Sequence, residues 1–329
     1  MISHINLSVI IPVHNGGESF KRCLESLTVS MRSTDEIIVV DDASTDTSAT
    51  SARAAGMKVI SIQGKPRGPA FARNRGALAA HGDVLVFFDA DVALHHDTLA
   101  CIERYFLTHP NIAAVFGSYD DNPLERSIVS LYKNLQHHYV HQHGNQVSST
   151  FWTGCGAIRR NIFESIGGFS EQYTRPSIED IELGRRLNHA GYRVWLCSDI
   201  QVSHLKRWTL TGWLKSDIFD RAIPWSRLIL REAHLPGDLN LDWRNRLSAG
   251  AAWINILCLI MGIFVPWIWI ISGFCLAVIA TINLDMYCFF ARKGGFLFAI
   301  AAIFFHFLYF LYSSATFVIM AVRYKLLHS

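Results

Sequence analysis

The stretch "LSVIIPV", from Leu7 to Val13, is a short β-branched run that ends in a glycine-rich turn, His14-Asn15-Gly16-Gly17. Such a run before such a turn is typical of a buried strand. Apolar residues then recur at helical spacing, and the same order of strand, turn and helix repeats with apolar runs at 36–40, 57–62, 84–88 and 112–116. Strict alternation of strands and helices predicts an α/β domain, with a mostly parallel sheet covered by helices on both faces.

Polar residues gather where these predicted strands end. In such a sheet, ligands bind beyond the carboxyl ends of the strands, and Pro12, Asp42, Asp89 and Asp91 all fall there. The run "VLVFFDADV" (84–92) places two carboxylates one residue apart directly after five apolar residues. A carboxylate is costly to take out of water unless a cation or several donors receive it. The pair therefore predicts a binding site at this edge of the sheet.

The second part of the chain is much more apolar than the first. Residues 249–284 contain no charged side chain, nor do residues 296–322, and each run exceeds the roughly 18 to 20 residues of a spanning helix. We expect a catalytic domain over 1–205, an interfacial segment over 206–246, a transmembrane hairpin or one long span over 247–284, a loop over 285–295 and a transmembrane helix over 296–322. Pro266 suits the turn of a hairpin. This predicts a multi-pass membrane protein with two or three spans.

The segment 206–246 interleaves tryptophans with lysines and arginines. Such segments beside a span tend to lie in the headgroup layer, although an ordinary surface helix is the alternative. Thirty basic residues nearly balance twenty-seven acidic ones, so no nucleic-acid partner is expected. The N-terminal stretch has no basic lead and too short an apolar core for a signal peptide, and the seven cysteines form no CxxC motif. These features predict a cytoplasmic catalytic domain.

Several short motifs, taken in order, resemble one family. The chain is similar to the inverting nucleotide-sugar glycosyltransferases of glycosyltransferase family 2, which have the GT-A fold. The resemblance covers about 200 residues and is specific as a set, although any one motif alone would be weak. The motifs are "SVIIPVHN", "IIVVDDASTD", "ARNRGA", "FFDADV", "TGCGAIRR", "IGGF", "IEDIELGRRL" and "VSHLKRW".

The resemblance assigns roles to the two aspartates and to a distant histidine. It implies that Asp91 binds a divalent cation, Mn²⁺ or Mg²⁺, and that Asp89 lies mainly on the sugar-nucleotide side with a weaker part in metal binding. It also implies that His204 completes the metal site. A haloacid-dehalogenase phosphatase also carries a DxD after an apolar strand. That class usually puts this strand first in its domain, whereas three strand-helix units precede it here.

The donor and the catalytic base follow from the same resemblance. Asp42 would accept the N3 hydrogen of a uracil or thymine, Pro12 would position the backbone against the base, and Arg73 would face the nucleotide, with a surface salt bridge as its alternative. Glu179 and Asp180 match the family's ED motif, which makes Asp180 the catalytic base. Helix capping is the alternative for this acidic pair.

Two further pairs are weaker candidates. Gly154 and Gly156 suit a loop at which the backbone approaches a sugar or an acceptor closely. Arg207 and Trp208 are similar to the basic-aromatic motifs that grip donor phosphates in processive relatives, but the QxxRW form is absent, which puts processivity in doubt.

These observations favour a metal-dependent transferase that moves a sugar from a nucleotide diphosphate, UDP being favoured, to a hydroxyl group. The apolar tail suggests that the acceptor is a membrane lipid or a lipid-linked saccharide. One alternative is a polyprenyl-phosphate glycosyltransferase, whose acceptor is already an anion and needs a base less. Another is a membrane-anchored binding protein that has lost turnover.

Overall fold

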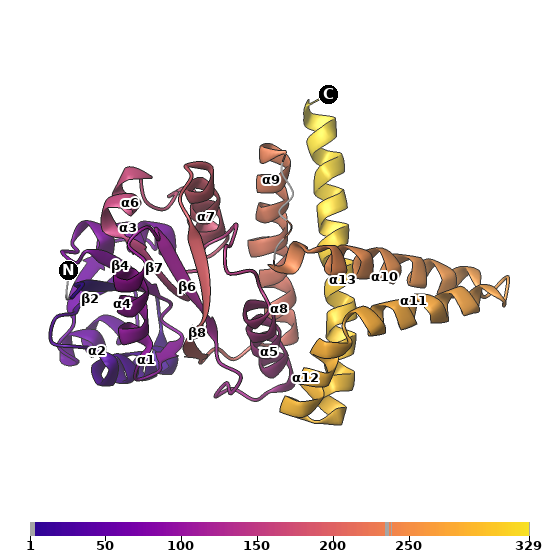
Figure 1. Cartoon of the computed structure of the whole chain (residues 1–329), viewed down its shortest axis with the longest axis horizontal. Coiled ribbons are helices and arrows are strands. Elements are labelled where there is room, and N and C mark those ends of the chain that lie inside the picture. The colour runs from indigo at the N-terminus through magenta and orange to yellow at the C-terminus, as the bar shows by residue number, and fades with distance from the viewer. Residues whose placement is uncertain (1–3, 234–236, 238, 329) are drawn as a thin grey trace. The chain divides into compact units, whose positions relative to one another are not determined.

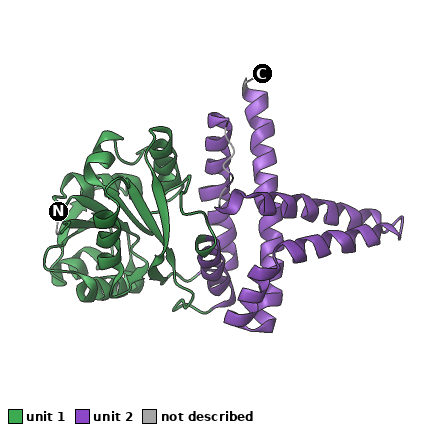
Figure 2. Ribbon diagram, in the orientation of Figure 1, with its two compact units in different colours: residues 1–126, 141–207 green, residues 127–140, 208–329 purple. Residues whose placement is uncertain are grey.

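The computed structural model describes residues 4–233, 237 and 239–328. The chain divides into two compact units (Figures 1 and 2). Residues 1–126 and 141–207 form a sheet unit, and residues 127–140 and 208–329 form a helical unit. The helix α5 (Ile128–Gln142) lies mostly in the helical unit, so the chain leaves the sheet unit and returns to it before it leaves again at 207.

The described residues of the sheet unit form one sheet of eight strands in the order β3-β2-β1-β4-β7-β6-β8-β5. The pairs β3-β2, β2-β1, β1-β4 and β6-β8 are parallel, and β4-β7, β7-β6 and β8-β5 are antiparallel. The expected α/β sheet is therefore confirmed, with a mixed rather than uniform direction. The strands are β1 (Leu7–Val13), β2 (Glu36–Asp42), β3 (Lys58–Ile62), β4 (Val84–Phe88), β5 (Val92–Leu94), β6 (Ala114–Tyr119), β7 (Cys155–Arg159) and β8 (Val194–His204).

Helices cover both faces of this sheet because its central strands are apolar on both sides. All seven residues of β1 are buried. Its residues 7, 9, 11 and 13 belong to one core with apolar residues of α1 (Gly17–Ser30), α2 (Ser48–Ala54) and α4 (Thr98–Thr108). On the other face, α3 (Pro69–Leu78) lies so close that a Cβ on Gly76 would be 2.4 Å from Cγ2 of Ile10. A strand buried on both faces reads as a continuous apolar run, which is why these strands were predictable.

The antiparallel strand β7 brings a later segment to the predicted edge. Its first residue, Cys155, pairs with Phe88, the last residue of β4. Similarly, the end of β8 at His204 pairs with Val92 at the start of β5. The mixed direction of the sheet thus places the starts of β7 and β5 beside the carboxyl ends of β4 and β8. The helices α6 (Arg160–Ser165) and α7 (Glu179–His189) complete the sheet unit.

The helical unit is built around an aromatic core, in which Tyr132, Trp213 and Phe290 are fully buried. Two of its helices, α10 and α11, form a hairpin whose turn spans 262–267 and contains Pro266. The remaining elements are α8 (Leu210–Lys215), the π-helix η1 (Ser216–Ala222), α9 (Ile223–Glu232), the 3₁₀ helix η2 (Leu239–Leu241), α10 (Trp243–Met261), α11 (Ile268–Ile282), α12 (Leu284–Gly294) and α13 (Phe296–His328).

The loop expected at 285–295 is wrong, because these residues form α12. Asp285 lies in its first turn, and Arg292 and Lys293 lie in its last turn, where each charge opposes the helix dipole. Among the described residues, one helix, Phe296–Leu327, is long and apolar enough to cross a membrane. A second candidate arises only if α11 and α12, which meet at a 69° bend, are counted as one span. Part of the segment expected at 206–246, residues 234–236 and 238, lies outside the described residues.

Candidate active site

The predicted polar residues meet at one edge of the sheet. Asp42 is the last residue of β2, Asp89 follows β4 directly, and Asp91 precedes β5 directly. Pro12 lies one residue before the end of β1, between these strands, and pairs with Val40. Since β2, β1 and β4 are parallel neighbours, their carboxyl ends share this edge.

A buried arginine joins two of the predicted acidic residues. Arg73, in α3, donates from Nη2 to Oδ1 of Asp89 at 2.7 Å and from Nη1 to Oε1 of Glu179 at 2.8 Å. The side chains of Arg73 and Glu179 are almost completely buried, whereas that of Asp89 is 34% exposed. Burial works against the charge of the guanidinium, but Asp89, Glu179 and Asp180 outweigh it and raise the pKa of Arg73. Arg73 is therefore a permanent cation that ties the end of β4 to the start of α7, not a surface ion pair.

This bridge separates the roles of the two neighbours in the ED motif. Glu179 faces inward to Arg73 and also accepts the backbone N–H of Ser177 at 2.9 Å. Asp180 is partly exposed, and its Oδ2 accepts from the backbone N–H and the hydroxyl of Thr153 at 3.2 and 3.3 Å. Asp180 is thus the member of the pair that a bound molecule can reach.

The surroundings of Asp180 also favour proton uptake. Desolvation by the surrounding protein and the charge of Glu179 raise the pKa of Asp180 from 3.8 to about 6, while Arg73 and the N–H groups of Thr153 and Ile181 act in the opposite direction. A carboxylate with this pKa is ionised at neutral pH and still basic enough to accept a proton. Thr153, which orients it, comes from the "TGCG" motif, but the sequence alone offered no reason to single it out.

Asp42 already has a structural role at this edge. Its carboxylate accepts the backbone N–H of Arg67 at 2.9 and 3.0 Å and that of Gly68 at 2.7 Å, and its side chain is buried. Gly68 adopts a positive φ of 93°, and a Cβ there would lie 2.5 Å from the carbonyl carbon of Thr174. Asp42 therefore holds the segment before α3 in place, which accounts for its burial without a nucleotide.

The backbones of Asp91 and His204 are close together, because the end of β8 pairs with the start of β5. Leu205 donates its N–H to the backbone oxygen of Asp91 at 2.8 Å, and His204 pairs with Val92 in the sheet. The ring of His204 is buried and stacks on Tyr119 with 4.2 Å between ring centres. No group of three or more His, Cys, Asp or Glu side chains suited to a metal occurs in the part of the chain that the structure describes. The carboxylate of Asp91 is a ligand of the kind that Mg²⁺ and Mn²⁺ prefer, and such ions commonly take their other ligands from substrate phosphates and water.

The expectation of an open glycine loop is wrong for Gly156. This residue lies within β7, between Phe87 of β4 and Phe116 of β6. A Cβ on it would lie 2.6 Å from Cζ of Phe151, and one on Gly154 would lie 2.2 Å from Cζ2 of Trp152. At Gly156 a Cβ would also lie 2.3 Å from the backbone oxygen of Trp152, so atoms of the chain itself fill the space beside both glycines.

The pair Arg207 and Trp208 is also divided. Arg207 is exposed at the end of the sheet unit, whereas Trp208 is buried in the aromatic core of the helical unit, where its backbone N–H donates to Oγ of Ser130 at 2.8 Å. A buried indole cannot grip a donor phosphate, so that expectation is wrong for Trp208. Its apolar ring explains the burial.

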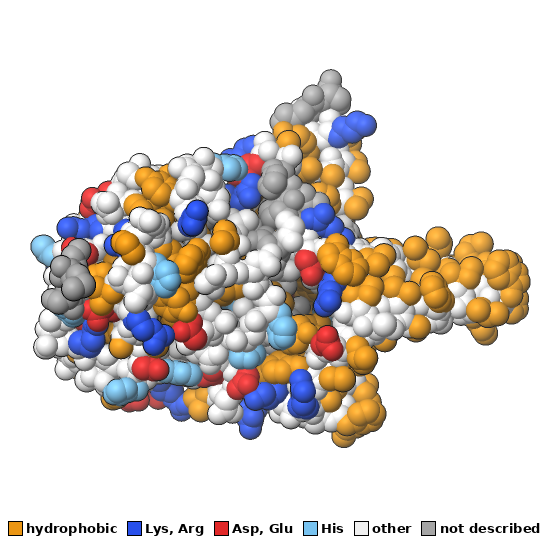
Figure 3. Space-filling model, viewed as in Figure 1, with side chains coloured by type: hydrophobic (Ala, Val, Ile, Leu, Met, Phe, Trp, Pro, Cys, Tyr) orange, Lys and Arg blue, Asp and Glu red, His pale blue; other side chains and the backbone are white. Residues whose placement is uncertain are grey.

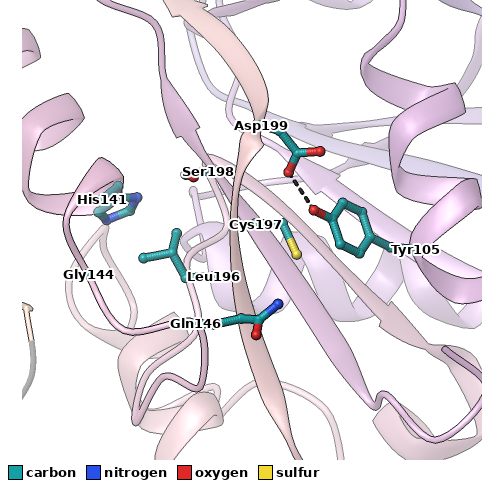
Figure 4. A pocket seen from close by; sticks show the side chains of 8 residues that line it. All are labelled: Tyr105, His141, Gly144, Gln146, Leu196, Cys197, Ser198 and Asp199. Carbon is teal, nitrogen blue, oxygen red and sulfur yellow. Dashed lines mark hydrogen bonds between the residues drawn. The ribbon is translucent and has the colours of Figure 1, made fainter.

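A hollow of about 200 Å³ lies elsewhere in the sheet unit (Figure 4). The hydroxyl of Tyr105 donates to Oδ1 of Asp199 at 2.6 Å beside it. None of the predicted site residues lines this hollow. Its lining residues are Tyr105, His141, Gly144, Gln146, Leu196, Cys197, Ser198 and Asp199.

Comparison with known proteins identifies the family. Residues 8–167 match the family model "Glycosyl transferase family 2", and residues 134–207 match "N-terminal domain of galactosyltransferase". The glycosyltransferase AglE of Haloferax volcanii is 35% identical over 223 residues, which is 61% of this chain and 67% of that protein. The O-antigen chain rhamnosyltransferase RfbN of Salmonella typhimurium is 25% identical over 235 residues, which is 67% of this chain and 74% of that protein. The matches cover about half (46%) of two further curated relatives.

A solved structure supports the fold over nearly the whole chain. The mannosyltransferase PcManGT from Pyrobaculum calidifontis, determined with GDP-Man and Mn²⁺, superposes with a TM-score of 0.58 at 18% identity, covering 98% of this chain and 87% of that one. At this identity the likeness concerns the fold alone. Together with the sequence relatives and the geometry at the edge of the sheet, it leads to one conclusion: this chain belongs to glycosyl transferase family 2 and is a glycosyltransferase with the GT-A fold.

Proposed function

We propose that this enzyme is a metal-dependent inverting glycosyltransferase, which moves a sugar from a nucleotide diphosphate, UDP being favoured, to the hydroxyl of a membrane lipid or a lipid-linked saccharide. The observation that carries the proposal is the arrangement at the start of α7. Glu179 is neutralised by the buried Arg73, while Asp180 is partly exposed and has a pKa raised to about 6. A base of this kind is what a neutral hydroxyl acceptor needs.

The reaction is a single displacement at the anomeric carbon. Asp180 takes the proton of the acceptor hydroxyl as its oxygen forms the new bond, and the nucleotide diphosphate departs from the opposite face, so the configuration inverts. Thr153 orients the carboxylate through its N–H and hydroxyl. Arg73 keeps Glu179 and Asp89 paired, so that Asp180 works beside a compensated charge rather than beside two free carboxylates.

The donor would bind along the carboxyl edge of β1, β2 and β4. Pro12 and Asp42 would face the nucleobase, and Asp89 would face the ribose. Arg73 would face the sugar nucleotide. Asp91 and His204, with Asp89 as a weaker contributor, would hold Mn²⁺ or Mg²⁺. Such an ion would stabilise the negative charge that develops on the departing diphosphate. That PcManGT was crystallised with GDP-Man and Mn²⁺ supports a nucleotide-sugar donor and a divalent cation here.

A hydroxyl acceptor is preferred to polyprenyl phosphate because of Asp180. An acceptor that is already an anion needs no base, so a raised carboxylate pKa would have no use. A catalytically inactive scaffold is disfavoured because Arg73 pairs with both Asp89 and Glu179, and Asp180 is held by Thr153. We place the sheet unit in the cytoplasm and the acceptor in the membrane, on the strength of the apolar helices that follow it.

The role of Asp180 is tested by Asp180→Asn, which keeps the shape of the side chain and one acceptor oxygen but cannot take a proton. We expect transfer to fall at least a hundredfold, while the thermal shift caused by the donor stays unchanged. Asp199→Asn, at a carboxylate outside the site, is the control and should keep its activity. Full activity of Asp180→Asn would refute the assignment of the base, and transfer to polyprenyl phosphate alone would favour the alternative acceptor.

The metal site is tested by Asp91→Ala in a thermal-shift screen against UDP-, GDP- and dTDP-sugars with and without Mn²⁺ or Mg²⁺. We expect the wild-type protein to respond to one donor only when the cation is present, and Asp91→Ala to lose this response. Asp97→Ala, at an exposed aspartate six residues further on, should behave like wild type. An unchanged response of Asp91→Ala to donor and cation would show that the cation is held elsewhere.

A further inference from the structure

The hairpin of α10 and α11 carries an apolar arm, residues 254–274, which extends past the point where the hairpin packs on α13. At that point Ala251, Ala252 and Ile279 form a core with Phe310 of α13. Beyond it the side chains are exposed on every side of the arm, with Phe264 at 76%, Ile270 at 75% and Phe274 at 68%. Figure 3 shows hydrophobic side chains along the hairpin to its tip, with charged side chains only near its base.

The polar side chains of the arm are turned away from its surroundings. Asn255 and Ser272 are its two amide or hydroxyl side chains, and they are 2% and 4% exposed. Nδ2 of Asn255 donates to Oγ and to the backbone oxygen of Ser272 at 2.8 and 3.1 Å, between the two helices. Such pairing satisfies both groups internally, as hydrocarbon surroundings require. A protein partner would cover one face of the arm, whereas lipid would cover all of them.

The turn of the hairpin is unsuited to water. Residues 259–271 read "LIMGIFVPWIWII", without a charged, amide or hydroxyl side chain. The backbone N–H groups of residues 262–265 all donate to carbonyl groups of residues 258–261. A turn that re-emerges into water is usually rich in Gly, Asn, Asp and Ser. This turn instead has the composition and the satisfied backbone of a segment that stays in an apolar medium.

The arm is also too short to cross a bilayer. Along α10 it measures about 12 Å from Ile254 to Met261, and even counted from Arg246, the last charge before it, the distance is about 22 Å. The hydrocarbon layer is about 30 Å thick. Arg244 and Arg246, both exposed, precede the apolar stretch, and their charge suits anionic headgroups on the side where the hairpin begins.

The neighbours of α13 indicate that this helix does not cross either. The hydroxyl of Tyr312, midway along α13, donates to Oδ2 of Asp217 at 2.6 Å, and Asp217 also pairs with Lys133 at 3.0 Å and with Arg221 at 3.7 Å. The helix α9, which packs along α13, exposes Arg227 and Arg231. A helix bordered by these charges cannot be surrounded by lipid over its middle turns.

From these observations we propose that the α10–α11 hairpin enters one leaflet of a phospholipid bilayer and returns to the same side, with its tip in hydrocarbon and α13 lying along the membrane surface. This rests on the membrane location proposed above and replaces the multi-pass arrangement expected from hydropathy. The enzyme is then held at the surface that contains a lipid acceptor, without any part of the hairpin or of α13 reaching the other side.

Thiol labelling tests this topology. Phe264→Cys at the tip and Leu326→Cys near the end of α13 replace exposed side chains, and the exposed native Cys288 on α12 is the reference. The protein is added to preformed sealed liposomes that contain phosphatidylglycerol, with a membrane-impermeant maleimide either outside or trapped inside. Peptide mass spectrometry reads each site separately.

We expect the outside reagent to modify Cys288 and the thiol of Leu326→Cys, and neither reagent to modify the thiol of Phe264→Cys until detergent is added. Labelling of Phe264→Cys by the trapped reagent would mean that the hairpin crosses, and labelling from outside would mean that it lies in water. Protection that persists in detergent would mean that protein covers the tip. Labelling of Leu326→Cys only from inside would mean that α13 crosses. Each of these results overturns the proposal.

A charge at the tip provides a second test. Ile263→Lys should reduce co-flotation with these liposomes at least tenfold, because an ammonium group in hydrocarbon is strongly disfavoured. Leu78→Lys is the matched control, since Leu78 is an exposed leucine of the sheet unit (78%) and should leave flotation unchanged. Wild-type flotation of Ile263→Lys would overturn the proposal. Donor thermal shifts are measured on both variants, so that a failure of the proposed reaction is seen apart from a failure of the anchor.

Discussion

Single residues at the start of α7 differ in their surroundings, and this difference underlies the proposed chemistry. Glu179 and Asp180 are neighbours of the same type, yet the first is paired with Arg73 and the second is reachable and has a raised pKa. The motif alone singled out Asp180 as the proposed base. The reason for the difference, a contact between Arg73 and a residue 106 positions away, was not predictable, because it depends on how α3 and α7 pack in the folded chain.

Asp180 should control both the rate and the stability as pH changes. Transfer requires its ionised form, so we expect the rate to rise through about pH 6 and to level off above it. Its pKa is raised in the folded chain, so the folded state holds more protons than the unfolded state between pH 4 and 6. The free energy of unfolding therefore falls as pH rises through this window.

The matched variant Asp180→Asn isolates this effect on stability. At pH 8 its free energy of unfolding should exceed that of wild type by on the order of 1 kcal/mol, and its melting temperature should be higher. Both differences should vanish near pH 4. Thermal melts across this range measure it. A difference that does not depend on pH would show that Asp180 titrates normally in the folded enzyme.

At the scale of elements, the close approach of α7 to the segment 150–153 positions Asp180, the proposed base. Gly184 permits this approach, since a Cβ there would lie 2.2 Å from the backbone nitrogen of Phe151 and 2.4 Å from the carbonyl carbon of Thr150. Both neighbours are backbone atoms, so they cannot rotate away as a flexible side chain could. The glycine in "IEDIELG" is thus explained by packing between two elements that together hold Asp180 and Thr153.

Gly184→Ala should therefore push α7 away from this segment. We expect it to destabilise the protein by about 1–3 kcal/mol and to lower transfer, despite the better helix propensity of alanine. Gly250→Ala, in α10, is the control because its Cβ would meet nothing within 4 Å. Thermal melts and transfer assays compare the two. Equal effects at both glycines would contradict the packing argument.

The success of the sequence-based predictions also differed between elements. The strands of the sheet were predicted because burial on both faces leaves a continuous apolar run, as in β1. The prediction for Gly156 failed because the space beside it is filled by the backbone oxygen of Trp152 and the ring of Phe151, a packing that the motif does not reveal. The helix α12 was mistaken for a loop because its charges at 285, 292 and 293 resemble a polar connection, although they lie in its first and last turns.

At the scale of the whole molecule, the two units are not consecutive along the chain. Residues 127–140 belong to the helical unit, although sequence on both sides of them belongs to the sheet unit. Within the helical unit the ring of Tyr132 packs on those of Trp213 and Phe290, at 5.3 and 5.9 Å between centres. The boundary expected near 205 lies close to the last point at which the chain leaves the sheet unit. It could not show that residues 127–140 belong to the helical unit, because the apolar face of α5 suits a core in either unit.

A truncated chain that ends at Arg207 should for this reason not fold into a soluble catalytic domain. It retains α5 without Trp213 and Phe290, so we expect it to aggregate during size-exclusion chromatography. The same truncated chain with Leu131→Glu and Leu135→Lys, at two buried positions of α5, should be more soluble. A monodisperse, active truncated chain without these changes would show that α5 needs no partner from the helical unit.

The placement of α5 in the helical unit has a consequence for synthesis on the ribosome. The apolar face of this helix is complete once residue 142 has been made, but its partners in the aromatic core extend to Phe305. At about 5–20 residues per second, roughly 10 to 30 seconds separate the two. During this interval the nascent enzyme presents an uncovered helix face, so its yield in the cell should depend on chaperones that act while translation is still under way.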